Sequence, residues 1–151
     1  MEHSSLQRQV AYGKKSLVDQ GYLDEQFYEL EELEDEASPN FVEEVVTLFF
    51  CDSSRLVANI EQALEKCPQD FRRLGSLAHQ LKDSTTSIGA LRVKNECTRF
   101  REYCDEENLQ GCQGSFQKVK REHAILKQKL EAYFQLLRQT GPAARATCSG
   151  D

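Results

Sequence analysis

His79 is the side chain whose surroundings best suit chemistry. Lys82 and Asp83 follow it at three and four residues, so in a helix all three would lie on one face. Apolar residues recur on the other side of the same segment, from Phe71 to Ile88, so the face with His79 should turn to solvent. A neutral imidazole nitrogen is a nucleophile near pH 7, and a lysine beside it can compensate an anion. The alternative is an ordinary solvated histidine.

The other histidines and the cysteines are expected to be structural. His3 lies in the terminal segment, and His123 lies on an apolar seam, where we expect a hydrogen-bonded core residue. Six cysteines stand at positions 51, 67, 97, 104, 112 and 148. They form no C-x-x-C pair and no finger-like spacing with a histidine, so the sequence predicts no metal site. Without a secretion signal, we expect small, buried and reduced thiols.

Helical periodicity indicates an all-α fold around these residues. Between Gly and Pro residues it predicts six helices, at about 5–20, 24–36, 40–67, 70–88, 91–108 and 112–139. In the last one, apolar spacings of three and four alternate from Phe116 to Leu137, which is typical of a bundle seam. The lengths favour an antiparallel four-helix bundle with two additional N-terminal helices. We therefore expect an N-terminal helix and linker at 1–23, the bundle at 24–139 and a disordered tail at 140–151.

Charge and composition exclude several classes of function. A net charge of −6 argues against nucleic acid as a partner, and the longest nearly apolar run, Val45 to Cys51, is too short to cross a membrane. Neither a signal peptide nor a nucleotide-binding loop is present in the sequence, so we expect an intracellular protein that is not an ATP-dependent enzyme. Residues 24–47 hold ten of the 25 acids and no Lys or Arg. They form either paired, solvated helix faces or an acidic surface that selects partners.

The segment around His79 resembles a known family signature. Residues 78–90 read AHQLKDSTTSIGA, which is similar to the H-x-x-K-G-S-S motif, followed closely by G-A, of histidine-containing phosphotransfer (HPt) proteins. The similarity extends from about Asp24 to Arg138. It includes PNFVEEVV at 39–46, LFF at 48–50 and FREYC at 100–104, which resemble the plant branch. The fold of that family is a four-helix bundle with the histidine exposed, in agreement with the periodicity.

This resemblance implies a phosphorelay carrier without kinase activity of its own. His79 would accept a phosphoryl group from the receiver domain of a hybrid sensor histidine kinase and pass it to an aspartate of a response regulator, in cytokinin signalling. Lys82 would stabilise the phosphate. No cofactor is expected to bind, and Mg²⁺ would come from the partner receiver domain. The plant branch implies a location in cytoplasm and nucleus. Candidate partner contacts on or beside the exposed stripe are Gly75, Ser76, Gln80, Asp83 and Thr86.

Asp83 departs from the family signature, which has glycine at this position. A carboxylate four residues after His79 can contact the imidazole, but it would repel a phosphoryl group carried there. We therefore expect slower or weaker relay than in a relative with glycine, and faster relay after Asp83→Gly. This departure also motivates an alternative function, an HPt-like protein that occupies receiver domains and relays phosphate poorly. A helical scaffold without phosphate chemistry is the third alternative.

Overall fold

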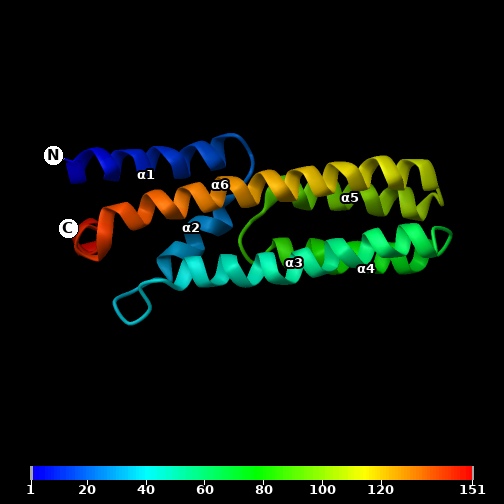
Figure 1. Cartoon of the computed structure of the whole chain (residues 1–151), viewed down its shortest axis with the longest axis horizontal. Helices are drawn as coiled ribbons and strands as arrows, with labels where there is room; N and C mark the ends of the chain where they lie inside the picture. Colours follow the sequence, from blue (N-terminus) through cyan, green and yellow to red (C-terminus); the bar gives the residue numbers. More distant parts are fainter. Residues whose placement is uncertain (1, 151) are drawn as a thin grey trace.

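The computed structural model describes the backbone of residues 2–150 and the side chains of residues 5–140. Within the described residues the chain is helical and has no strand (Figure 1), as the periodicity predicted. The helices are α1 (Glu2–Asp19), α2 (Glu25–Glu32), α3 (Phe41–Lys66), α4 (Phe71–Thr85), α5 (Leu91–Asp105) and α6 (Leu109–Gly150). None of them, in the described part, is long and apolar enough to span a bilayer.

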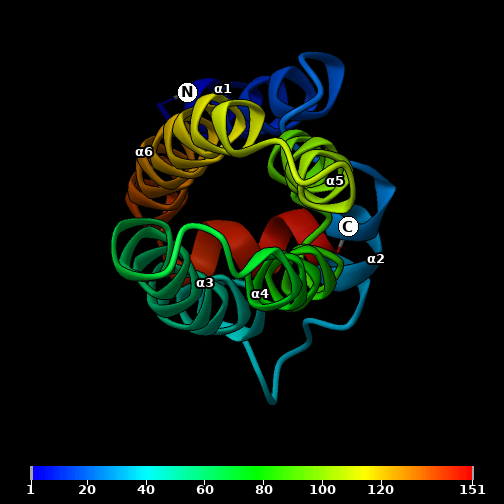
Figure 2. The ribbon, with the colours of Figure 1, turned by 90° about the vertical axis from the view of Figure 1, so that its right-hand side faces the viewer.

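Helices α3 to α6 form an antiparallel four-helix bundle, which confirms the predicted architecture. Viewed along the bundle axis they form a ring in chain order, with α4 diagonally opposite α6 (Figure 2). The two N-terminal helices lie outside this ring, and α1 runs along the C-terminal part of α6 (Figure 1). The apolar stripes of the four bundle helices meet in one core, whose fully buried members include Leu56, Ile60, Leu74, Leu81, Val93, Phe100, Phe116, Leu126 and Leu130.

Several helix ends differ from the sequence-based prediction, among them the ends of α4 at Thr85 and of α5 at Asp105, which were expected at 88 and 108. The second helix stops at Glu32 instead of 36, and the sixth begins at Leu109 instead of 112. The early start has a local cause, because the Asn108 side chain accepts a hydrogen bond from the backbone N–H of Gly111 at 2.9 Å. The backbone of α6 is helical to Gly150, beyond the predicted end at 139. Side chains after residue 140 lie outside the described part, so the disordered tail at 140–151 stays a prediction.

The turn between α4 and α5 is joined to the turn between α1 and α2 by backbone hydrogen bonds. The N–H of Asp24 donates to the carbonyl of Gly89 at 2.9 Å, and the N–H of Leu91 donates to the carbonyl of Tyr22 at 3.2 Å. Gly89 has a φ of 74°, in the left-handed region. The Asp24 side chain also caps α2 by accepting from the N–H of Gln26 at 2.8 Å. This junction fixes the end of α4 that follows His79.

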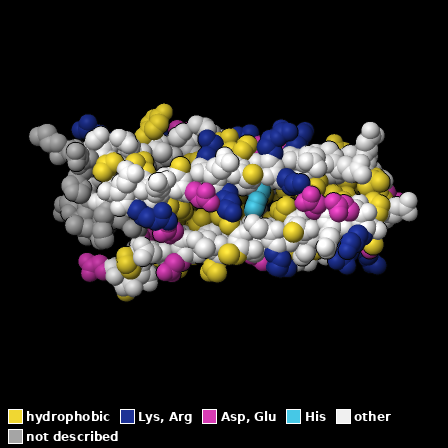
Figure 3. All heavy atoms as spheres, in the orientation of Figure 1, with side chains coloured by type: hydrophobic (Ala, Val, Ile, Leu, Met, Phe, Trp, Pro, Cys, Tyr) yellow, Lys and Arg dark blue, Asp and Glu magenta, His cyan; other side chains and the backbone are white. Residues whose placement is uncertain are grey.

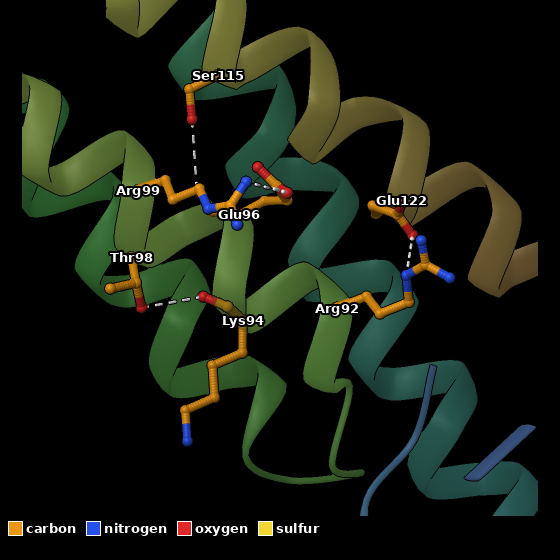
Figure 4. Close-up of polar contacts among 7 residues, drawn as sticks. All are labelled: Arg92, Lys94, Glu96, Thr98, Arg99, Ser115 and Glu122. Atoms are coloured by element: carbon orange, nitrogen blue, oxygen red, sulfur yellow. Dashed lines mark hydrogen bonds and ion pairs between the residues drawn. The ribbon is translucent and has the colours of Figure 1, made fainter. Parts of the chain in front are cut away.

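Polar contacts hold α5 against α6 on the side of the bundle drawn in Figure 4. Arg92 of α5 pairs with Glu122 of α6 at 3.2 Å, and the Ser115 hydroxyl of α6 donates to the carbonyl of Glu96 at 3.5 Å. Within α5, Glu96 also pairs with Arg99 at 3.5 Å. The Glu96 and Glu122 carboxylates are mostly shielded from solvent, with 15% and 13% of their side chains exposed. The Arg92–Glu122 pair and the Ser115 hydrogen bond therefore fix the position of α5 against α6.

The expectation that all cysteines are buried is wrong for two of them. Cys97, Cys104 and Cys112 are buried and reduced, as predicted. Cys51 is exposed because it lies on the outer face of α3, and Cys67 is exposed because α3 ends at Lys66 and Cys67 caps it. The side chain of residue 148 lies outside the described part of the chain.

Candidate functional site

His79 projects from the middle of α4 into solvent. The helix begins at the Asp70 cap, whose side chain accepts from the N–H of Arg73 at 3.1 Å. The apolar face turns inward and buries Leu74, Ala78, Leu81 and Thr85. This orientation leaves 53% of the His79 side chain exposed. The predicted exposure of this imidazole is therefore confirmed, and a partner protein can reach its ring.

Asp83 lies against the His79 ring, one helical turn further along α4. Its Oδ2 is 3.3 Å from Nε2 of His79, and 67% of the Asp83 side chain is exposed. The structure thus confirms that the two side chains share a face and shows that they are in contact. A carboxylate at this distance attracts a protonated imidazole and repels an anion bound to the ring.

Lys82 is half-buried on the side of α4 that faces α5. Its charge acts on Cys97 of α5, where it partly opposes the effect of burial and of Glu96 that raises the pKa of that thiol to about 12. Among the described residues Lys82 has no ion-pair partner. Its ammonium group is therefore not neutralised by a carboxylate of the described residues.

Thr86 and Ser87, which follow Asp83 in the chain, form hydrogen bonds with carbonyls in the last turn of α4. The Thr86 hydroxyl donates to the carbonyl of Asp83 at 2.6 Å, and the Ser87 hydroxyl donates to the carbonyl of Ser84 at 2.8 Å. The same two carbonyls also accept the backbone N–H groups of Thr86 and Ser87 at 3.2 Å, so the hydroxyl bonds reinforce the last turn of the helix. Thr86 remains exposed and stays a predicted partner contact, but its hydroxyl is already bonded within the helix.

The other predicted contacts lie on or near the same surface. Ser76 and Gln80 are exposed on α4, one turn before His79 and directly after it. Gly75 is half-buried and faces α5, because a Cβ added there would lie 3.8 Å from Cβ of Cys104. That distance is an ordinary van der Waals contact, so an alanine would fit. The roles of these three residues toward a partner stay predictions.

His123 is a structural residue, as the sequence indicated. It is buried between α6 and α3, and its Nε2 forms a 2.8 Å hydrogen bond with the Ser53 hydroxyl. The rings of Phe49 and Phe50 surround it, with centroid distances of 6.3 and 5.4 Å. Burial, with a smaller contribution from Lys127, lowers the pKa of His123. The ring is therefore neutral in the folded protein near pH 7 and has no access to a partner.

Cys104 and Cys112 form a buried contact that the sequence did not predict. Their Sγ atoms are 3.7 Å apart, where the end of α5 meets the start of α6. Burial raises the pKa of both thiols, so they stay protonated. Periodicity within one helix could not reveal this pair because its members belong to different helices. Among the described side chains no cluster of three His, Cys, Asp or Glu could hold a metal ion.

Part of the acidic 24–47 stretch is paired with cations from other helices. Glu31 accepts from Lys14 of α1 at 3.0 Å, and Glu43 pairs with Arg138 of α6. Figure 3 looks onto α3 and α6 and shows basic and acidic side chains mixed along this face. These contacts favour the interpretation of paired and solvated helix faces for this part of the stretch.

Known proteins are similar to this chain in sequence and in structure. The family described as "Hpt domain" matches residues 44–140, a range that includes His79. A rice protein named "Pseudo histidine-containing phosphotransfer protein 2" is 66% identical over 149 residues, which cover 99% of both chains. "Histidine-containing phosphotransfer protein 4" of Arabidopsis thaliana is 63% identical over 116 residues, which cover 77% of this chain and 91% of that protein.

The solved structures agree with the sequence comparison. The crystal structure of a histidine-containing phosphotransfer protein from Medicago truncatula superposes with a TM-score of 0.86 at 42% identity, covering 91% of this chain and 94% of that one. Hpt proteins are phosphocarriers that work with the receiver domains of kinases and response regulators in two-component phosphorelays. From its sequence, its bundle and the position of His79, the chain belongs to the Hpt family and is similar to its plant members.

Proposed function

We propose that this protein carries a phosphoryl group on His79 between receiver domains. It accepts the group from an aspartyl phosphate on the receiver of a hybrid sensor histidine kinase and passes it to an aspartate of a response regulator. The observation that carries the proposal is the 53% exposure of His79 beside Lys82, whose ammonium has no ion-pair partner among the described residues. The protein supplies no nucleotide and no kinase chemistry of its own.

The transfer step uses the lone pair of a ring nitrogen. Nε2 of His79 is the nitrogen further from the helix backbone, so we assign it as the nucleophile. With the ring proton on Nδ1, the lone pair of Nε2 attacks phosphorus, a P–N bond forms, the P–O bond of the aspartyl phosphate breaks and the receiver regains a free carboxylate. Delivery to the response regulator is the reverse of this step. Such transfers need positioning and charge compensation above all, and a lysine at helical spacing supplies about 0.7–3 kcal/mol per charge pair. Mg²⁺ is expected to come with the receiver domain.

We also propose the signalling pathway and the cell compartments in which the relay works. The relatives from rice and Arabidopsis support a role in plant two-component signalling, and we propose the cytokinin pathway as its input. We further propose that the protein works in both cytoplasm and nucleus, since a chain of 17.3 kDa is small enough to diffuse between them. Loss of the cytokinin response in plants that lack this protein would support the first statement.

A second candidate function is favoured by the contact at Asp83. A protein that docks onto receivers but accepts phosphate poorly would compete with working carriers. The 3.3 Å distance from Asp83 to the His79 ring and the word "pseudo" in the name of the rice relative support this candidate. The presence of both His79 and Lys82 favours the working carrier.

Phosphate transfer to purified protein tests the two candidates. A radiolabelled phospho-receiver domain with Mg²⁺ is mixed with wild type, His79→Gln, Lys82→Gln and the control Lys118→Gln. Lys118 is an exposed lysine on α6, which is diagonal to α4 (Figure 2). We expect acid-labile, alkali-stable label on wild type and on the control, slower labelling of Lys82→Gln and none of His79→Gln.

Binding of the same receiver separates the remaining outcomes. If wild type takes no label but binds the receiver as tightly as His79→Gln does, the competing function is correct and the carrier proposal is wrong. If neither labelling nor binding occurs with any receiver tested, both proposals are wrong, and the bundle serves as a scaffold.

A further inference from the structure

We propose that Asp83 keeps phosphorylated His79 sparsely populated, so that phosphate passing through this protein rests on the receiver domains and not on the carrier. This inference rests on the proposed function and concerns its equilibrium. A carrier of this kind transmits phosphate without storing it. Asp83, which stands where the family signature has glycine, is responsible.

The Asp83 carboxylate lies next to the ring nitrogen that would carry the phosphoryl group. Oδ2 of Asp83 is 3.3 Å from Nε2 of His79, the nitrogen to which we assign the phosphoryl group. When phosphorus is bonded to that nitrogen, its oxygens extend into the space next to Asp83. The contact that is favourable in the free protein, between ring and carboxylate, is thereby replaced by a repulsion between two anions. Phosphorylation therefore loses an attraction and gains a repulsion at the same atom.

One positive and one negative side chain accompany His79 on α4. Lys82 contributes one positive charge on the α5 side of His79, and Asp83 contributes one negative charge on the same exposed stripe. A phosphoryl group with about two negative charges near pH 7 is attracted by one and repelled by the other. A protein with glycine at this position keeps the attraction and lacks the repulsion. Among the described residues Asp83 forms no ion pair with a lysine or arginine, so the bundle does not neutralise its charge.

Asp83 still allows phosphoryl transfer within the docked complex. While a receiver is docked, the Mg²⁺ that we expect it to bring compensates part of the phosphoryl charge, so Asp83 affects the bound transition state less than the free phosphoprotein. After the receiver leaves, only Lys82 remains to offset the charge. The free phosphoprotein is thus the state that Asp83 destabilises most, and the equilibrium constant for transfer shifts toward the aspartyl phosphate of the receiver.

Solvent limits how far Asp83 can shift the equilibrium constant for phosphorylation of His79. With 67% of its side chain exposed, Asp83 can rotate away from the phosphate, and water screens the pair. At separations of about 4–5 Å in a water-like dielectric, removing this charge should raise the equilibrium constant for His79 phosphorylation roughly tenfold. Salt should reduce that ratio, because the Debye length falls from about 10 Å at 0.1 M to about 3 Å at 1 M.

The test measures the distribution of label at equilibrium between the protein and one receiver domain, at 0.1 M and 1 M KCl. Asp83→Asn keeps the size of the side chain and removes its charge, whereas Asp83→Gly removes both. Asp19→Asn is the matched control, since it removes an exposed carboxylate that also belongs to an i,i+4 pair, with Lys15 of α1. We expect about tenfold more label on Asp83→Asn and Asp83→Gly than on wild type or the control, relative to the receiver, and a smaller ratio at high salt.

The possible outcomes differ in what they overturn. Equal equilibrium constants for wild type and Asp83→Asn would show that the charge has no effect and would refute the inference, while the carrier function would stand. A rise with Asp83→Gly alone would assign the effect to side-chain size and would also refute it. Absence of label on all variants, with the receiver still phosphorylated, would instead overturn the proposed function.

Discussion

Replacement of Gly89 by alanine tests whether the N-terminal turn holds the end of α4 in place. Gly89 has a φ of 74°, and an added Cβ would lie 2.1 Å from Oδ1 of Asp24 and 3.0 Å from Cβ of Gln26. Asp24 must therefore move. That movement disturbs two contacts, the cap on the N–H of Gln26 at 2.8 Å and the backbone bond from Asp24 to the Gly89 carbonyl at 2.9 Å.

The expected loss follows from these contacts. A left-handed alanine costs about 1–2 kcal/mol relative to glycine, and loss of an N-cap costs about 1 kcal/mol. Together with the displaced backbone bond, Gly89→Ala should lower the free energy of unfolding by about 3 kcal/mol. For a domain of this size that corresponds to a fall in Tm of roughly 6–12 °C. Urea unfolding followed by circular dichroism measures the free energy, and calorimetry measures Tm.

Two other glycines separate the causes. Gly21 also has a positive φ, of 79°, but a Cβ there would meet nothing within 4 Å, so Gly21→Ala should cost only the backbone term of about 1–2 kcal/mol. Gly114 lies exposed within α6 with open space around it, so Gly114→Ala should gain about 0.5–1 kcal/mol. If Gly89→Ala loses no more than Gly21→Ala, the close approach of Asp24 contributes nothing and the reasoning is refuted.

Three further changes test other parts of the structure. Gly75→Ala should raise the free energy of unfolding by about 0.5–1 kcal/mol, because the new methyl group meets Cys104 at ordinary contact distance. A lower free energy of unfolding, measured by urea unfolding, would show that α4 and α5 cannot accommodate the methyl group. Glu107 has a φ of 55° between α5 and α6, so Glu107→Gly should raise Tm in calorimetry, by an amount equivalent to about 1 kcal/mol, and an unchanged Tm would contradict this. Burial, and to a lesser extent Lys127, lowers the pKa of His123, so the stability it contributes is complete above the unfolded value of about 6.5 and is lost as the pH falls from there toward the folded value. Urea unfolding between pH 7.5 and 5.5 should therefore show a decline in wild type that is reduced in His123→Gln, and equal slopes would refute the assignment.

Most of the candidate site could be predicted from the sequence because it belongs to one helix. At 3.6 residues per turn, the apolar residues of α4 decide which side faces the core. That spacing places His79 on the opposite side and brings Asp83 next to it, whatever the other helices do. The same argument predicted the buried seam of α6, including His123. Helix number and type followed from periods that extend over many residues.

Contacts between helices could not be predicted in this way. Asp24 and Gly89 lie 65 residues apart in the sequence, and nothing in either segment indicates that they touch. The thiols of Cys104 and Cys112 meet across a helix connection, and the exposure of Cys67 depends on the residue at which α3 ends. Sequence spacing carries no distance information once the chain has turned, so these features needed the packed bundle.

The sequence by itself determined that this chain forms helices, that His79 faces outward and that Lys82 and Asp83 accompany it, because each of these depends on the geometry of a single helix. The tertiary structure decided how the four helices close into a ring and which of the cysteines are buried. It also decided that Ser53 is the hydrogen-bond partner of His123, and that Lys82 faces α5 without an ion pair among the described residues. These depend on the distances between residues of different helices, which are set only when the apolar stripes pack together in one core.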